Sequence, residues 1–102
     1  MTQLMKGALP NVLGAIGRTP IIKLERIGAD LPASLYVKCE FMNPGGSMKD
    51  RMVLRMLDEA EKRGELKPGH TIVEATSGNT GAAIAMIAAV RGYKCIFVMP
   101  DK

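Results

Sequence analysis

Residues 79–91 are apolar on nearly every side when they are drawn as a helix, and Gly92 follows directly after them. A glycine just past the last helical residue is a common helix stop. A helix without a polar face has to be covered by other elements. Close packing is expected through its small residues, Ala82, Ala83, Ala85, Ala88 and Ala89. The sequence therefore predicts a buried helix over 79–91.

Four short runs rich in Ile, Val and Leu are candidate strands, and Gly or Pro marks most of their boundaries. They cover residues 21–24, 35–40, 71–74 and 94–99. Between the second and third runs lies an amphipathic stretch at helix period. Its apolar stripe consists of Met52, Val53, Met56, Leu57 and Ala60, and Gly64 is a plausible stop. Strands that alternate with helices predict βαβ units, a parallel sheet and an α/β fold.

Composition argues against several classes of function. The chain has 102 residues and a net charge of +4, but its basic residues are scattered among acids without neighbouring aromatics, so no nucleic-acid partner is expected. No run is long enough to span a bilayer, so no membrane partner is expected and the location is cytoplasmic by default. Cys39 and Cys95 lack a CxxC spacing and are predicted to be buried free thiols. A single histidine, His70, gives metal ligation little support.

Two loops rich in Gly and Ser, residues 43–49 and 76–81, each follow a strand and open a helix. In open α/β sheets ligands gather outside the carboxyl ends of the strands, so the two loops can face one cleft. The second loop offers hydroxyls, an amide and two glycines at a helix N-terminus, which suits a carboxylate or a phosphate. The structural alternative is that Ser77 or Asn79 simply caps the helix.

Lys49 stands at the start of the first predicted helix, where a cation is disfavoured by the helix dipole. Partial burial and the positive helix end both favour a neutral amine, the form that attacks an aldehyde. Asp50 would partly oppose this effect, and it is also spaced from Ser47 as a capping pair. The alternative is a solvated lysine after a cap. The residues alone leave both interpretations open.

Together the two loops carry a resemblance. GGSMKDR at 45–51, followed by EATSGNTG at 74–81, resembles the cysteine synthase and cystathionine β-synthase family of fold-type II enzymes that depend on pyridoxal 5'-phosphate (PLP). The likeness spans nearly the whole chain, from IGRTP at 16–20 through KCEFMNP at 38–44 to RGYKCIFVMP at 91–100. Several ordered motifs at family spacing make this signal specific.

The resemblance implies a role for each matching residue. Lys49 would bond to the aldehyde carbon of PLP and later move the α-proton of the substrate. Asn79 looks like the residue that hydrogen-bonds the 3-hydroxyl oxygen of the cofactor. The residues that match the loop gripping the substrate carboxylate are Thr76, Ser77, Gly78 and Thr80. An amino acid held in this way is oriented for cleavage of its Cα–H bond.

The implied reaction is a β-replacement on serine or O-acetylserine. A sulfur nucleophile adds at Cβ, giving cysteine with sulfide or cystathionine with homocysteine. The implied partners are therefore a small amino-acid substrate and a sulfur donor, and the full-length family forms homodimers. Family members are several times longer, so residues 1–102 are expected to be the N-terminal part of a catalytic domain whose remainder is absent.

The chain departs from the family pattern at Met48, where a smaller β-branched residue is more usual before the lysine. The glycine-rich loop that holds the cofactor phosphate, and the residue that faces the pyridine nitrogen, are expected in the absent part. Two alternatives therefore stay open. One is a non-catalytic interaction or regulatory fragment of the family, and the other is a relative of threonine dehydratase or threonine synthase.

Overall fold

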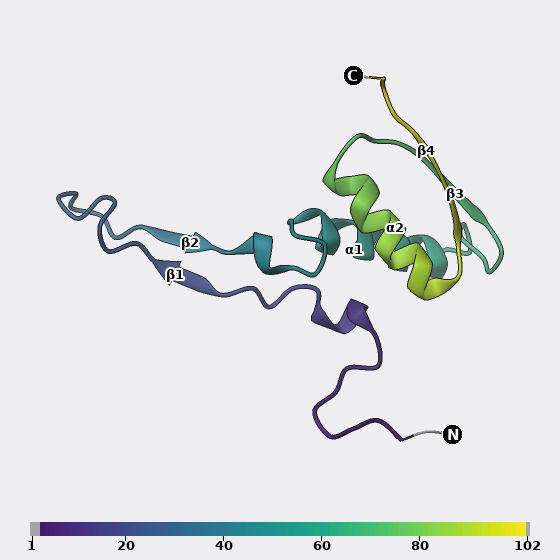
Figure 1. The fold of residues 1–102 in the computed structure, drawn as a ribbon, viewed down its shortest axis with the longest axis horizontal. Coiled ribbons are helices and arrows are strands. Elements are labelled where there is room, and N and C mark those ends of the chain that lie inside the picture. Colours follow the sequence, from purple (N-terminus) through teal and green to yellow (C-terminus); the bar gives the residue numbers. More distant parts are fainter. Residues whose placement is uncertain (1–2, 102) are drawn as a thin grey trace.

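A computed structural model describes residues 3–101 of the chain (Figure 1). The elements are the 3-10 helices η1 (Val12–Ala15) and η2 (Glu40–Met42), the strands β1 (Ile21–Lys23), β2 (Tyr36–Lys38), β3 (Thr71–Ala75) and β4 (Lys94–Val98), and the helices α1 (Lys49–Lys62) and α2 (Asn79–Arg91). Within these residues no helix is both long and apolar enough to cross a membrane.

The C-terminal half is a βαβ unit. Strands β3 and β4 pair in parallel, with Thr71 opposite Lys94 and Ala75 opposite Val98, and α2 connects them. Gly92 ends α2 in the left-handed conformation, with φ of 81°, and its N–H donates to the Ala88 carbonyl over 2.8 Å. A glycine adopts this conformation without a steric penalty. The predicted α/β fold with a parallel sheet is confirmed here.

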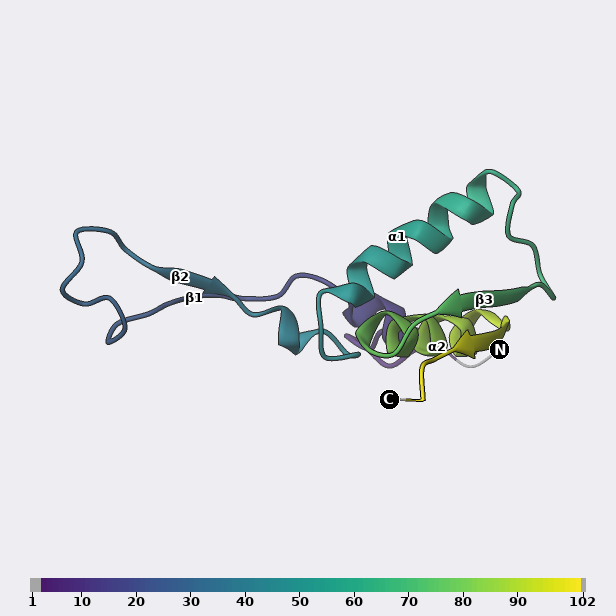
Figure 2. The ribbon, with the colours of Figure 1, turned by 90° about the horizontal axis from the view of Figure 1, so that it is seen from above.

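The first two strands do not join this parallel sheet. Within residues 3–101, strands β1 and β2 pair only with each other, antiparallel, with Ile22 opposite Val37. No helix lies between them, and without a crossover element the chain can only turn back on itself. Both strands are also shorter than the runs 21–24 and 35–40 predict. They form a hairpin that extends away from the helices and from the β3–β4 sheet (Figures 1 and 2).

The hydrophobic core lies between the helices and the inner face of the β3–β4 sheet. Its buried members come from α1 and α2: Val53, Leu57, Ala83, Ile84 and Ile87. Partly buried apolar residues pack around them, including Leu13, Ile16, Ile72, Cys95 and Phe97. Helix α1 therefore contributes the apolar stripe that its sequence predicts, and this packing fixes the start of α1 relative to α2.

Helix α2 is less completely covered than the sequence predicts. Ala83 and Ala88 are buried, but Ala82, Ala85 and Ala89 are exposed. Helix α1 covers one side of α2 and the sheet contacts another, and the remaining side has no cover within residues 3–101. The prediction of a helix buried on every side is therefore wrong for this part of the chain.

The two cysteines are free thiols. Cys39 is buried and Cys95 is half-buried on the inner face of β4. Burial raises the pKa of the Cys95 thiol. Both residues behave as small apolar side chains here.

Candidate active site

Lys49 is the first residue of α1, and it is half-buried. Its backbone N–H donates to the Ser47 hydroxyl oxygen over 3.1 Å, which satisfies one of the N–H groups that the first helical turn leaves without a partner. Within residues 3–101 its side-chain amine makes no hydrogen bond and no ion pair. The amine is therefore free of competing contacts from the described chain.

The predicted capping pair before Lys49 is only half correct. Ser47 accepts from the Lys49 N–H, and the Asp50 N–H lies 3.4 Å from the Ser47 carbonyl oxygen, not from its hydroxyl. The Asp50 carboxylate accepts from the N–H of Gly45 over 2.5 Å. The carboxylate reaches Gly45 because of a tight turn, which the Gly46 N–H closes by donating to the Asn43 carbonyl. This turn folds Gly45 back over the first turn of α1.

Glu40 joins the residues that follow Lys49 to the segment that precedes β1. Its carboxylate accepts from Arg51 Nε over 2.5 Å and from Arg51 Nη2 over 2.9 Å. The Thr19 hydroxyl donates to the same carboxylate. These bonds, Arg51 first and Thr19 second, hold the pKa of the Glu40 carboxyl below its ordinary value. A charged carboxylate with a two-pronged arginine gives this junction a defined geometry.

In the second loop Thr76 closes the turn between β3 and α2. Its hydroxyl oxygen accepts from the Gly81 N–H over 3.0 Å, and the Gly78 N–H lies 3.5 Å away. A Cβ at Gly81 would lie 2.6 Å from Thr76 Cγ2, so the close approach requires a glycine. The hydroxyl hydrogen of Thr76 stays available, since a hydroxyl donates as well as accepts.

The other polar side chains of the second loop stay free of protein partners. The N-cap of α2 is Gly78, without a side-chain hydrogen bond, so Ser77 and Asn79 do not cap this helix. In the part of the chain that the structure describes, neither these two side chains nor that of Thr80 makes a hydrogen bond. Of the first-turn N–H groups of α2, that of Gly81 donates to Thr76, whereas those of Asn79 and Thr80 have no helical acceptor. The loop therefore presents several donors toward an anionic group.

A cavity of about 250 Å³ opens beside this loop. Its lining residues are Thr76, Ser77, Gly78, Gly81, Ala82, Ala85, Phe97 and Met99. Three of the predicted site residues are thus brought together, whereas Asn79, Thr80 and Lys49 do not line this cavity. The prediction that both loops face one cleft is not met by the cavity beside the second loop.

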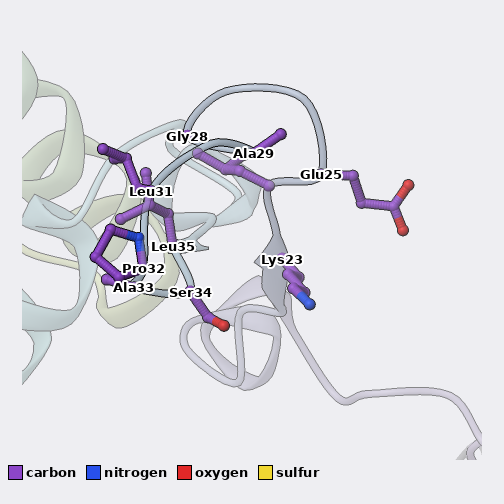
Figure 3. A pocket seen from close by; sticks show the side chains of 10 residues that line it. Lys23, Glu25, Gly28, Ala29, Leu31, Pro32, Ala33, Ser34 and Leu35 are labelled. Atoms are coloured by element: carbon purple, nitrogen blue, oxygen red, sulfur yellow. The ribbon is translucent and has the colours of Figure 1, made fainter.

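Another cavity, of about 400 Å³, lies in the turn of the β1–β2 hairpin (Figure 3). Its charged lining residues are Lys23 and Glu25, and Figure 3 shows the Glu25 side chain pointing away from the cavity. The rest of the lining is apolar or small, apart from Ser34. This cavity is separate from both loops and belongs to the hairpin alone.

The residues present suit PLP on chemical grounds. The cofactor needs a primary amine for its aldehyde, and Lys49 offers one that is half-buried and has no partner in the described part of the chain. An amino acid bound to the cofactor needs donors for its carboxylate, and the N-terminus of α2 offers hydroxyl and N–H groups. The donor set therefore fits the chemistry of the cofactor and of an amino-acid substrate.

Comparison with known proteins identifies the class. The chain belongs to the family of pyridoxal-phosphate dependent enzymes, whose model matches residues 12–102. A cystathionine beta-synthase from Apis mellifera is 59% identical over 96 residues, which cover 92% of this chain and 19% of that protein. A cysteine synthase from Staphylococcus aureus is 52% identical over 91 residues, covering 89% of this chain and 29% of that protein.

Solved structures agree with these relatives. A hydrogen sulfide-producing enzyme from Fusobacterium nucleatum superposes with a TM-score of 0.87 at 48% identity, covering 95% of this chain and 32% of that one. An O-acetylserine dependent cystathionine beta-synthase from Helicobacter pylori gives a TM-score of 0.83 at 40% identity, covering 93% of this chain and 32% of that one. The chain thus spans between about a fifth and a third of the length of these relatives.

Sequence reasoning assigned no role to three residues that organise the first loop: Thr19, Glu40 and Asn43. Asn43 is 4% exposed and bonds to Gly17, 26 residues earlier in the chain. Thr19 bonds to Glu40, 21 residues away. No local pattern encodes contacts between residues so far apart, and the signal that the sequence does carry is that all three lie in motifs of the family resemblance, IGRTP at 16–20 and KCEFMNP at 38–44.

Proposed function

We propose that this chain is part of a PLP-dependent enzyme that replaces the β-substituent of serine or O-acetylserine with a sulfur nucleophile. Residues 1–102 would form the N-terminal part of its catalytic domain. The observation that carries the proposal is Lys49, a half-buried amine at the start of α1 that has no side-chain partner among residues 3–101 and lies within the residues that match the family. The names of the relatives, cysteine synthase and cystathionine beta-synthase, support the reaction class.

Each loop has a separate task in this proposal. Lys49 would hold the cofactor through its side-chain nitrogen, and once the substrate amine has taken its place on the cofactor, the freed Lys49 amine would take the proton from Cα. The second loop holds the substrate carboxylate through the hydroxyl and N–H groups of Thr76, Ser77, Gly78 and Thr80. Asn79 donates its amide hydrogen to the oxygen on the cofactor ring. PLP, when bound, supplies the electron sink that acidifies the Cα–H bond.

The orientation of the substrate follows from the location of these donors. Three of the carboxylate-binding residues line one cavity, and the exposed N-terminus of α2 adds its positive dipole end. A carboxylate fixed there leaves the rest of the amino acid only a few orientations, which lowers the entropic part of the barrier to proton transfer. We therefore assign binding and orientation to the second loop, and proton movement to Lys49 Nζ.

Within this reaction class, the amino-acid substrate and the sulfur nucleophile define the particular activity. Cysteine synthesis takes sulfide and cystathionine synthesis takes homocysteine. One of the similar structures is an O-ureido-L-serine synthase, at 51% identity and a TM-score of 0.83, so relatives with this scaffold are named for different products. Product analysis with O-acetylserine or serine, each with sulfide or homocysteine, separates these activities. Threonine as substrate, with 2-oxobutanoate as product, would place the chain with the threonine dehydratases instead.

The first test is covalent labelling. The purified chain is mixed with PLP and reduced with borohydride, and the modified peptides are mapped. We expect labelling confined to Lys49, lost in Lys49→Ala and kept in Lys62→Ala, which removes an exposed lysine at the other end of the same helix. Labelling spread over many lysines, or none, would contradict a cofactor site in this chain and would favour a non-catalytic fragment.

A further inference from the structure

The loop that leads to Lys49, residues 44–48, is flanked by two buried polar side chains. Asn43, directly before the loop, is 4% exposed, and Asp50, directly after Lys49, is fully buried. Buried polar side chains are retained where their hydrogen bonds fix a geometry, because each of them loses its contacts with water. The contacts of these two side chains run across the loop in opposite directions.

Asn43 reaches forward across the loop. Its amide nitrogen donates to the Ser47 carbonyl over 3.1 Å and to the Glu40 carbonyl over 2.9 Å. Its amide oxygen accepts from the Gly17 N–H over 2.7 Å. Two carbonyls on one side and an N–H on the other leave only one orientation for this amide. Asn43 thereby fixes the end of the loop next to Lys49 and attaches it to the segment before β1.

Asp50 reaches backward across the same loop. One oxygen of its carboxylate accepts from the Gly45 N–H over 2.5 Å, at the start of the loop. The other oxygen lies against Gly45, where an added Cβ would sit 2.2 Å from it. Gly45 and the Asp50 carboxylate are therefore in direct contact, and any larger residue at position 45 would displace one or the other.

The Asp50 carboxylate is not optimal for stability. Its Oδ1 is buried and has no hydrogen-bond partner within residues 3–101. A buried carboxylate with one oxygen unpaired is unfavourable for folding, so a residue selected for stability alone would be apolar or fully bonded. Asp50 also stands in the first turn of α1, where the helix dipole favours a negative charge, and the one hydrogen bond that its carboxylate makes within residues 3–101 goes to the loop.

We propose that Asn43 and Asp50 are positioning residues that brace the 44–48 loop from both ends and thereby fix the direction of the Lys49 amine. The inference rests on the proposed function of Lys49. The Ser47 carbonyl oxygen is held by the Asn43 amide, and the Ser47 hydroxyl oxygen accepts from the backbone N–H of Lys49. Gly45 is fixed by Asp50. A buried side chain thus bonds to the loop near each end, so the backbone that leads to the Lys49 amine is held at two points.

The test uses the 102-residue chain with three variants. Asp50→Ala removes the acceptor for Gly45, whereas Asp50→Asn keeps an oxygen that can accept. Asn43→Asp keeps the shape of the side chain but cannot donate to the Ser47 carbonyl. Asp58→Ala is the matched control, because it lies on the same helix and breaks an ion pair with Arg91 without touching the loop.

Three quantities are measured: the urea midpoint, the exchange rate of the Gly45 amide, and the share of borohydride-fixed PLP label found on Lys49. For Asp50→Ala we expect Gly45 exchange at least tenfold faster and a Lys49 share at least threefold lower. Asp50→Asn should bring the Gly45 exchange rate and the Lys49 share of the label most of the way back to the wild-type values. Asn43→Asp should lower the Lys49 share in a chain that still folds. Asp58→Ala should lower the midpoint and leave the other two quantities unchanged.

The outcomes separate this inference from the proposed function. A wild-type chain that does not label at Lys49 contradicts the proposed function, while Gly45 exchange still tests the brace. A wild-type chain that labels at Lys49, with the same Lys49 share in Asp50→Ala and Asn43→Asp, overturns the positioning role whatever the exchange rates show. An Asp58→Ala chain that loses label as strongly as Asp50→Ala overturns it too, because the effect would then follow from lost stability.

Discussion

Arg18 has a left-handed backbone, with φ of 50°, and it is the one residue other than glycine with a positive φ within residues 3–101. Its side chain is exposed, so no packing of the side chain compensates for this conformation. Its neighbours hold it in place: the Gly17 N–H donates to Asn43, and Thr19 is buried beside Glu40. The strain at Arg18 is therefore imposed by the same contacts that organise the first loop.

Relief of this strain should stabilise the chain. Asparagine tolerates the left-handed region far better than arginine, so Arg18→Asn should raise the free energy of unfolding by about 0.5–1 kcal/mol. The measurement is the urea midpoint. Arg26→Asn is the control, because Arg26 is also exposed but has no positive φ. An equal shift in both variants would mean that strain at Arg18 is not the cause.

Glu40 should make the free energy of unfolding depend on pH in the acid range. Its pKa is lowered in the folded state, chiefly by Arg51 and then by Thr19, so its charged form stabilises the fold at neutral pH. That contribution is complete above the ordinary glutamate pKa and is lost as the pH falls through the lowered folded-state pKa. The midpoint difference between the wild type and Glu40→Gln should therefore be large at about pH 7 and small at about pH 2.

The control for this pH experiment is Glu25→Gln, which removes one negative charge from the exposed hairpin turn. Its midpoint difference from the wild type should stay small and change little with pH, since exposed charges contribute little. A Glu40→Gln difference that stays constant from neutral to acid pH would contradict the role of the ionised carboxylate.

At the scale of elements, α1 and α2 are joined by more than their apolar stripes. Arg91, the last residue of α2, donates to Asp58 over 2.6 Å and to Glu61 over 3.0 Å, both on α1. The Tyr93 hydroxyl donates to the same Glu61 over 2.9 Å. Burial, and then this hydrogen bond, raise the pKa of Tyr93. One arginine therefore fixes the end of α2 to the C-terminal part of α1.

Removal of this arginine should weaken the contact between the helices. Arg91→Ala breaks two partly exposed ion pairs and should lower the free energy of unfolding by about 1 kcal/mol. Arg63→Ala is the comparison, because its pair with Glu65 is exposed and only two residues apart, and it should cost less than about 0.5 kcal/mol. Urea titrations of the two variants give the difference. Equal losses would show that the ion pairs between the helices add nothing beyond a surface pair.

The elements that the sequence predicts well are those defined by local pattern. Helix α2 has the predicted bounds, and β3 and β4 differ from the predicted runs by one residue each, because strand alternation and the Gly92 stop are local signals. The pairing of β1 with β2 and the exposure of Ala85 depend on which elements are near in space. Likewise Lys49 and the 76–81 loop stand out in the sequence, whereas the bond from Asn43 to Gly17 joins segments that no local pattern connects.

At the scale of the whole molecule, one face of the β3–β4 sheet is not covered by any of residues 3–101. Val73 and Ile96 lie opposite each other in register and are 61% and 56% exposed, and Val98 beside them is 59% exposed. The β1–β2 hairpin adds Ile21 and Tyr36, also more than half exposed. The relatives are about three to five times longer, and we propose that in such a protein other parts of the catalytic domain cover this face. A homodimer of the complete protein remains a prediction.

The exposed face should make the isolated chain associate. Contiguous aliphatic surface on a sheet favours contact between copies. We expect sedimentation velocity to show oligomers that increase with concentration, and Val73→Lys combined with Ile96→Glu to shift the chain toward monomer. The new pair lies directly across the two strands, so the opposite charges offset part of the lost packing. Unchanged association in this double variant would assign the contact to another surface, such as the hairpin.

The hairpin that extends from the helices has a consequence for how the folded chain scatters X-rays. The radius of gyration of the Cα atoms is 17.6 Å, whereas a spherical protein of this length has about 13 Å. Judged by chain length alone, a small-angle profile of the native chain would suggest partial unfolding. A pair-distance distribution with a compact peak and a long tail would instead identify a folded body with an arm, and deletion of the arm should lower the radius of gyration and shorten that tail.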